Sequence, residues 1–191
     1  MPGSRTDWLL SAPVYATSAK ADTPLFPFLS RLMRREDLNE REAADFFRAL
    51  IDINANPAQI AAALTALTSK GETSEELAGM ASVMRAASIK IQTTQKGAVD
   101  IVGTGSSSAK TFNVSTAAAL VAAGAGLTVA KQCNRGFTTK SGSADVLGEL
   151  GIKVAGEPSV AQTSLRGTGL CFLFAPKFHP QLRRVGDIRA S

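Results

Sequence analysis

The sequence predicts an α/β protein, with a small N-terminal α-helical bundle followed by an incomplete parallel α/β domain. Up to about Ser88, apolar residues recur at the spacing of amphipathic helices. From near Gly97, short apolar runs alternate with helix-like stretches, a pattern typical of crossover units in a parallel sheet. We therefore divide the chain of 191 residues into a loose extension (1–23), a helical domain (24–90) and an α/β domain (91–191).

The helical half contains clear start signals. Asn39 and Glu42 have the spacing of a capping box. A single buried stripe is predicted behind them, formed by Ala43, Phe46, Phe47, Leu50 and Ile51.

Two further helices are predicted in this half. One begins at Asn56-Pro57 and ends at Gly71, a position that favours a left-handed C-cap. The other begins at a second capping box, Thr73 with Glu76. The inner faces are predicted to be Ile60, Leu64 and Leu67 in the first helix, and Leu77, Met80, Ala81 and Met84 in the second.

In the second half the predicted strands are Val99–Val102, Leu127–Ala130 and Leu170–Phe174. The predicted helices are Ser115–Ala125, Ser143–Leu150, Pro158–Leu165 and Pro180–Ala190. Such a sheet would leave an edge exposed, so the domain is expected to be unfinished.

Composition excludes several classes of protein. No apolar run approaches the roughly 20 residues of a membrane helix. Two cysteines and one histidine exclude a disulfide framework and a His-rich metal site. The first residues make a poor signal peptide, so we expect a cytoplasmic protein. The net charge of +5 suits an anionic ligand, although no aromatic-interleaved basic stripe favours nucleic acid.

Two polar loops carry the candidate chemistry. The first runs from Gly103-Thr104-Gly105 to Thr111–Thr116, from a strand end to a helix start, where free N–H groups attract anions. The second, Lys131–Thr139 followed by Ser141–Asp145, gathers cations, an amide and hydroxyls that could surround a phosphate. An ordinary capped turn remains the alternative for the first loop, and a solvated charge remains the alternative for Lys131 or Arg135 alone.

Asp100–Thr116 and Lys131–Asp145 resemble the paired signature loops of the anthranilate phosphoribosyltransferase family, G-T-G-G-D-G-x-x-T-F-N-[IV]-S-T and K-H-G-N-R-x-x-S-S-x-S-G-S-A-D. The similarity extends to Asn56–Ile60, Lys70–Thr73, Phe174–Pro176 and His179-Pro180. Pyrimidine nucleoside phosphorylases have a similar second loop but match the first less well.

The resemblance implies an enzyme of tryptophan biosynthesis, a magnesium-dependent glycosyltransferase that forms a homodimer through its helical half. It would transfer the 5-phosphoribosyl group of phosphoribosyl pyrophosphate to the amino group of anthranilate and release pyrophosphate. Positioning and charge neutralisation would carry this reaction, without a catalytic nucleophile.

By resemblance, the phosphoribosyl donor would bind at Gly103, Ser106, Ser107, Thr111, Asn113, Val114, Ser115, Thr116, Lys131, Asn134, Arg135, Gly136, Phe137, Thr138, Thr139 and Ser143. Anthranilate would lie against Gly103, Asn134 and Arg189, and the Ser115 hydroxyl would ligate one Mg²⁺. A solvated helix residue is the alternative for Arg189.

The chain departs from the family pattern in three places. Ser106-Ser107-Ser108 replaces Gly-Asp-Gly, Gln132-Cys133 replaces His-Gly, and no Asp-Glu pair follows the second loop, where the family has one that binds Mg²⁺. A fragment, a truncated gene product and a degenerate, non-catalytic homologue that binds phosphosugar or nucleic acid therefore all remain open. We interpret Cys133 as a small buried residue and His179 as a cap of the following helix.

Overall fold

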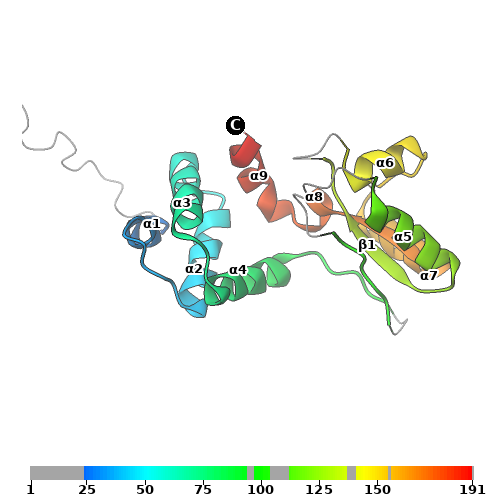
Figure 1. Cartoon of the computed structure of the whole chain (residues 1–191), viewed down its shortest axis with the longest axis horizontal. Helices are drawn as coiled ribbons and strands as arrows, with labels where there is room; N and C mark the ends of the chain where they lie inside the picture. Colours follow the sequence, from blue (N-terminus) through cyan, green and yellow to red (C-terminus); the bar gives the residue numbers. More distant parts are fainter. Residues whose placement is uncertain (1–23, 94–96, 104–111, 137–140, 155, 191) are drawn as a thin grey trace, which may run out of the picture.

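The computed structural model describes residues 24–93, 97–103, 112–136, 141–154 and 156–190. Figure 1 shows helices α1–α4 at one end of the molecule and the α/β half at the other, with α8 and α9 between them. The helices of the first half are α1 (Phe26–Met33), α2 (Glu40–Ile51), α3 (Pro57–Lys70) and α4 (Ser74–Ala87). The predicted helical bundle is thus confirmed.

The predicted helix starts are confirmed by their hydrogen bonds. The Glu42 N–H donates to Asn39 Oδ1 at 2.9 Å, and the Asn39 N–H donates to Glu42 Oε2 at 3.0 Å. Thr73 and Glu76 form the second capping box at the start of α4. Asn56 caps α3, which ends at Gly71 with a positive φ of 87°, although its ψ of 132° is not left-handed helical.

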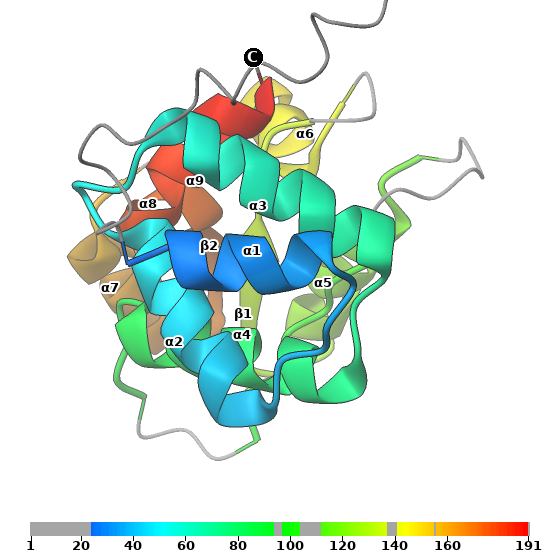
Figure 2. The same ribbon diagram turned by 90° about the vertical axis from the view of Figure 1, so that its left-hand side faces the viewer.

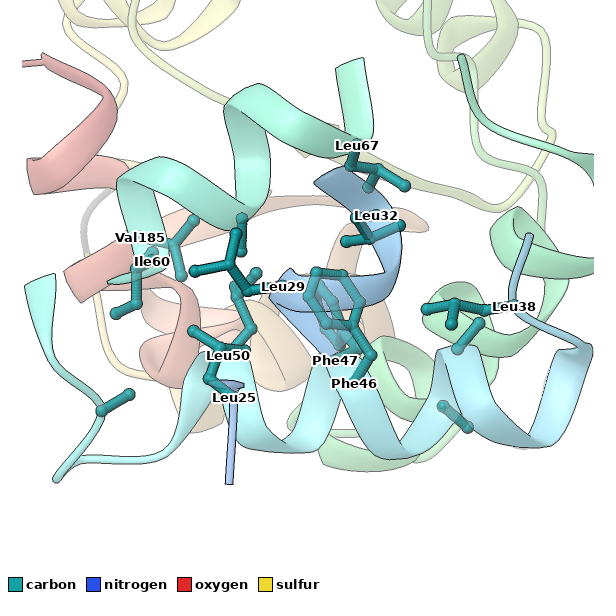
Figure 3. Packing of buried hydrophobic residues seen from close by; sticks show 14 of the residues in the cluster. Leu25, Leu29, Leu32, Leu38, Phe46, Phe47, Leu50, Ile60, Leu67 and Val185 are labelled. Carbon is teal, nitrogen blue, oxygen red and sulfur yellow. The ribbon is translucent and has the colours of Figure 1, made fainter. Parts of the chain in front are cut away.

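One continuous hydrophobic core fills the helical half (Figure 3). Phe46 and Phe47 of α2 lie at its centre between Leu29 and Leu32 of α1 and Leu67 of α3. Ala43 and Leu50 are buried as predicted.

The predicted inner face of α4 is right for Met80 and Met84, which are partly buried against the core, and wrong for Leu77 and Ala81, which are exposed. Leu77 is 54% exposed, and the buried positions are Glu76, Gly79 and Val83. Helix α4 crosses α2 so closely that a Cβ on Gly79 would lie 2.1 Å from the carbonyl oxygen of Glu40. This backbone contact sets the rotation of α4 and turns Leu77 outward.

The second half contains α5 (Val114–Gly124), β1 (Val129–Cys133), α6 (Ser143–Glu149), α7 (Pro158–Thr168) and β2 (Leu170–Phe174). Strands β1 and β2 form a parallel pair, with Val129 opposite Leu170 and Cys133 opposite Phe174. The incomplete parallel α/β fold is confirmed, although β1 begins two residues later than predicted.

The predicted strand Val99–Val102 is reduced to a single parallel bridge between Val99 and Val129. Two side chains replace the backbone ladder after this point. The Gln132 N–H donates to Asp100 Oδ1 at 3.0 Å, and Lys131 Nζ donates to the Ile101 carbonyl at 2.6 Å. The predicted strand ends after Val99, because the Gln132 N–H and the Ile101 carbonyl, which a longer ladder would use, are bonded to side chains instead.

The chain then returns to the helical half through α8 (Ala175–Phe178), a 3-10 turn (Pro180–Leu182) and α9 (Arg183–Ala190). The predicted helix 180–190 is therefore divided in two. Helix α9 lies beside α2 and α3 (Figure 2). Its Val185 is buried in the core of the helical bundle. The Arg184 guanidinium donates to the carbonyls of Ile53 and Ala55, which attaches α9 to the α2–α3 loop.

Candidate anion-binding site

The described ends of the two polar loops lie at the same end of the sheet. Val99 pairs with Val129 in parallel, so the segment before the first loop runs in the direction of β1. Helix α5 connects them and must run back, which brings its N-terminus to the end at which β1 finishes. Ligands of open α/β sheets bind at this carboxyl end of the strands.

The N-terminal turn of α5 has polar side chains that could bind an anion. Asn113 is the N-cap residue, yet its side chain makes no capping hydrogen bond. Thr116, in the first turn, is 2% exposed, and its buried Oγ1 has no hydrogen-bond partner. A buried hydroxyl without a partner costs about 1–3 kcal/mol, so it needs a ligand or water to bond. Ser115 and Val114 lie in the same turn.

Lys131 is buried, with 1% of its surface exposed. Burial lowers the pKa of its ammonium, and the charge of Asp100 opposes that effect. Its Nζ donates to the carbonyl of Ile101, two residues before Gly103. The alternative of a solvated surface lysine is therefore wrong, because the ammonium is held inside the protein where the first loop begins.

The start and end of the second loop are joined by Asp145. Its Oδ2 accepts the N–H groups of Gly136 and Gly142, each at 2.8 Å. These two hydrogen bonds lower the pKa of the Asp145 carboxyl. Ser143 adds to the closure, because its Oγ accepts the Asn134 N–H at 3.1 Å.

Gly142 is required at its position by packing. A Cβ there would lie 2.3 Å from the backbone of Arg135 and Gly136. The sequence reasoning assigned no role to Asp145 or Gly142. The available signal was their spacing, since Asp145 stands three residues after Gly142 at the start of α6 and bonds its N–H as in a capping box.

Asn134 and Arg135 lie at the surface of this loop. The Asn134 side chain accepts the Arg135 N–H at 2.9 Å, and the Arg135 guanidinium is 3.7 Å from Asp145. Because its side chain is 75% exposed, Arg135 has a solvated charge, as in the alternative stated from the sequence, and it forms an ion pair with Asp145.

Other predicted site residues are not brought to this place by described structure. Ser106, Ser107, Thr111, Phe137, Thr138 and Thr139 lie outside the described residues. Arg189 belongs to α9, which packs on α2 and α3, and its side chain lies outside the described part as well.

The two residues that depart from the family pattern in the second loop are accommodated by β1. Cys133 is buried against Ala144 and Leu147, so its side chain points into the core beneath α6. Burial raises the pKa of its thiol to about 11, which agrees with a structural residue rather than a nucleophile. Gln132 is held by its backbone to Asp100.

His179 does not cap the following turn, because its side chain makes no capping hydrogen bond. Its Nδ1 is buried without a partner. Burial, and then the charge of Lys90, lowers the pKa of the imidazole.

Comparison with known proteins identifies the family. The profile described as "Glycosyl transferase family, helical bundle domain" matches residues 26–88. The profile described as "Glycosyl transferase family, a/b domain" matches residues 95–191, half of the chain. The chain belongs to this glycosyl transferase family.

Curated relatives of this chain are anthranilate phosphoribosyltransferases. That of Herpetosiphon aurantiacus is 50% identical over 155 residues, which are 81% of this chain and 46% of the relative. That of Phenylobacterium zucineum is 46% identical over 165 residues, 86% of this chain and 49% of the relative. The chain therefore spans about half the length of the curated relatives that it matches.

Solved structures of the family agree. The anthranilate phosphoribosyltransferase from Thermus thermophilus matches with a TM-score of 0.77 and 39% identity, over 85% of this chain and 50% of that one. The enzyme from Saccharomyces cerevisiae in complex with PRPP and Mg matches with a TM-score of 0.78 and 27% identity, over 88% of this chain and 51% of that one.

Within the described residues of this chain, no group of three His, Cys, Asp or Glu side chains could hold a metal ion. The same residues contain no helix that is long and apolar enough to span a bilayer.

Proposed function

We propose that this chain forms the donor-binding part of an anthranilate phosphoribosyltransferase, which transfers the 5-phosphoribosyl group of phosphoribosyl pyrophosphate to the amino group of anthranilate. The products are N-(5-phosphoribosyl)anthranilate and pyrophosphate. This proposal is supported by the packing of α5, whose first turn holds the unpartnered Thr116 hydroxyl, against β1, which holds the buried Lys131.

The donor is a polyanion, and each of these groups suits one part of it. The positive end of the α5 dipole attracts phosphate oxygens, and the Thr116 hydroxyl can donate a hydrogen bond to one of them, whereas the Val114 and Thr116 N–H groups already donate to the Phe112 and Asn113 carbonyls. Lys131 and Arg135 supply positive charge, the first from a buried position and the second from the surface of the second loop. We assign the donor to Gly103, Asn113–Thr116, Lys131, Asn134–Gly136 and Ser143, with Ser106, Ser107, Thr111 and Phe137–Thr139 as further contacts.

The reaction needs orientation and charge stabilisation. Positive charge develops at the anomeric carbon as the bond to pyrophosphate breaks, and negative charge develops on the departing oxygens. Lys131 would neutralise part of that negative charge. The loop that Asp145 closes would hold Asn134 and Arg135 in place, so that no large rearrangement accompanies the reaction.

The described oxygen ligands at the site would suit a Mg²⁺ ion that arrives bound to pyrophosphate. Such an ion keeps phosphate oxygens and water as most of its ligands and needs one or two protein oxygens. The Ser115 hydroxyl, in the turn that contains the unpartnered Thr116 oxygen, would be one of them. When bound, Mg²⁺ stabilises negative charge on the leaving group. The Saccharomyces cerevisiae enzyme in complex with PRPP and Mg supports this assignment.

Anthranilate would be held by Gly103, Asn134 and Arg189, with the arginine pairing with its carboxylate. Support comes from another structure of the Saccharomyces cerevisiae enzyme, in complex with 4-fluoroanthranilate.

The helical half would join two copies of the protein.

Calorimetric titration of the full chain with phosphoribosyl pyrophosphate and Mg²⁺ tests the donor site. We expect saturable binding that weakens about tenfold or more in Lys131→Met, which keeps the length of the side chain but removes its charge. Lys153→Met is the matched control, because Lys153 is exposed and lies outside the site. The absence of binding by the unaltered chain, or equal affinity in Lys131→Met, would refute the donor site.

The transfer itself is tested by the loss of anthranilate fluorescence in the presence of donor and Mg²⁺. The protein used is this chain joined to the second half of the Herpetosiphon aurantiacus relative. Turnover supports the proposed reaction. Donor binding without turnover would favour the non-catalytic phosphosugar-binding homologue, whose supporting feature is Ser106-Ser107-Ser108 in place of Gly-Asp-Gly.

A further inference from the structure

Arg184 joins two parts of the chain that are far apart in the sequence. Its guanidinium donates through Nη1 to the Ile53 carbonyl and through Nη2 to the Ala55 carbonyl, which precede it by 131 and 129 residues. Both carbonyls belong to the turn that follows α2 and precedes α3, whereas Arg184 lies in the first turn of α9. One side chain therefore ties α9 to the helical bundle.

The turn between α2 and α3 offers these two carbonyls from fixed positions. The Ala55 N–H donates to the Asp52 carbonyl at 3.1 Å, and the Asn54 N–H donates to Asp52 Oδ1 at 2.7 Å. A guanidinium is a rigid plane with several N–H donors, so hydrogen bonds to two fixed acceptors define its direction as well as its distance. The contact consequently fixes how α9 is turned and where it lies along the bundle.

The apolar contacts of α9 with the bundle are less directional. Val185 lies in the core of the bundle (Figure 3), and Leu182 and Ile188 pack against that core while partly buried. Apolar contact favours burial without specifying one orientation. Because α9 has eight residues, which make about two turns, it would shift against α2 and α3 at little cost in apolar contact without the Arg184 hydrogen bonds.

We propose that Arg184 is a positioning residue for the acceptor substrate of the transfer reaction. Helix α9 also contains Arg189, so the place of this helix on the bundle sets the place of the Arg189 backbone. The inference rests on the proposed function, in which Arg189 pairs with the carboxylate of anthranilate. A pair of arginine and carboxylate needs the correct direction as well as distance, so a turn or shift of α9 weakens it.

The donor groups are held by contacts of their own. Lys131 Nζ donates to the Ile101 carbonyl at 2.6 Å, and Asp145 accepts the N–H groups of Gly136 and Gly142. These contacts lie within the α/β half, and α9 takes no part in them. Loss of the Arg184 hydrogen bonds should therefore weaken acceptor binding and leave donor binding unchanged. A purely structural role would lower both affinities together, through loss of folded protein.

The test compares Arg184→Met with the unaltered full chain in two calorimetric titrations. Anthranilate is titrated in the presence of Mg²⁺ and pyrophosphate, so that no transfer takes place, and phosphoribosyl pyrophosphate with Mg²⁺ is titrated separately. We expect the dissociation constant of anthranilate to rise about tenfold or more, and that of the donor to change less than about twofold. Arg183→Met is the matched control, because Arg183 is exposed in the same helix and both affinities should stay unchanged.

Arg184→Lys provides a graded variant, because its ammonium can donate to the same carbonyls but lacks the planar pair of donors. Anthranilate should bind to it more tightly than to Arg184→Met and more weakly than to the unaltered chain. If Arg184→Met does not fold, as judged by circular dichroism, Arg184→Lys takes its place in both titrations.

Three results would overturn the proposal. They are an unchanged affinity for anthranilate in the altered chain, an equal loss of affinity for the donor, and no binding of anthranilate by the unaltered chain. The last result would also refute the acceptor part of the proposed function. Absence of donor binding alone would refute the donor site, and the comparison of anthranilate affinity with the Arg183→Met control would still decide this proposal.

Discussion

Lys70 and Glu76 form an ion pair inside the helical half, with 2.9 Å between Nζ and Oε2 and side chains that are 4% and 1% exposed. Lys70 also donates to Asp37 Oδ1 at 2.7 Å and to the Gly71 carbonyl at 2.8 Å. Glu76 accepts the N–H groups of Thr73 and Leu38, each at 2.9 Å. The pair thus joins the end of α3 to the start of α4 and to the α1–α2 loop.

Glu76→Gln should destabilise the protein by about 3 kcal/mol, because it removes the buried counter-charge of the Lys70 ammonium and leaves only that of Asp37, which is exposed. The free energy of unfolding is to be measured by urea denaturation monitored by circular dichroism. Glu75→Gln is the matched control: Glu75 precedes it in the same helical turn but is exposed, so its loss should cost no more than about 0.5 kcal/mol. Equal effects of the two substitutions would contradict a structural role for the pair.

The same carboxylate should make the protein sensitive to acid. Burial disfavours the charged form of Glu76, but the hydrogen bonds from Lys70, Thr73 and Leu38 outweigh it, and the pKa lies below the usual 4.5. A carboxyl group of this kind stabilises the folded state fully above its unfolded pKa, and that contribution disappears as the pH falls through the folded pKa. We therefore expect the free energy of unfolding to decrease below about pH 4.5.

Urea denaturation at a series of pH values measures this dependence. Its control is Glu76→Gln, which has no carboxyl group at this position and should show a shallower decrease. Identical slopes for the two proteins would assign the acid sensitivity to other carboxylates.

Gly142→Ala should disrupt the second loop, because the added Cβ would meet the backbone of Arg135 and Gly136 at 2.3 Å. We expect a loss of about 2 kcal/mol or more in unfolding free energy, typical of backbone strain, and weaker binding of phosphoribosyl pyrophosphate. The matched control is Gly148→Ala in α6, where an added Cβ has no neighbour within 4 Å. That substitution should be neutral or stabilising by up to about 1 kcal/mol, as expected for alanine in a helix. Unchanged thermal unfolding and donor affinity in Gly142→Ala would show that the loop does not need the close approach.

Features decided by neighbouring residues could be predicted from the sequence. The capping boxes at Asn39 and Thr73 depend on contacts three residues apart, and both are present. The apolar stripe of α2 depends on helical periodicity alone, and Phe46, Phe47 and Leu50 are buried as expected. The loops at the carboxyl ends of the strands were likewise predictable, since their residue types follow short apolar runs.

Features decided by packing could not be predicted in this way. The face of α4 follows from the contact of Gly79 with α2, which no pattern within α4 reveals. The strand at Val99 ends after one bridge, because Asp100 and Lys131 replace the backbone partners with side chains. The local pattern of apolar and polar residues does not reveal either of these side-chain hydrogen bonds.

The sequence by itself determined where helices begin, which half is helical, which half is α/β, and which residue types gather in two loops. Only the tertiary structure decided that Lys131 is buried, that Asp145 closes its loop, and that Val185 of the last helix lies in the core of the first half. The reason is physical: capping and periodicity involve residues a few positions apart, whereas burial and loop closure depend on partners that the chain meets only after it has folded.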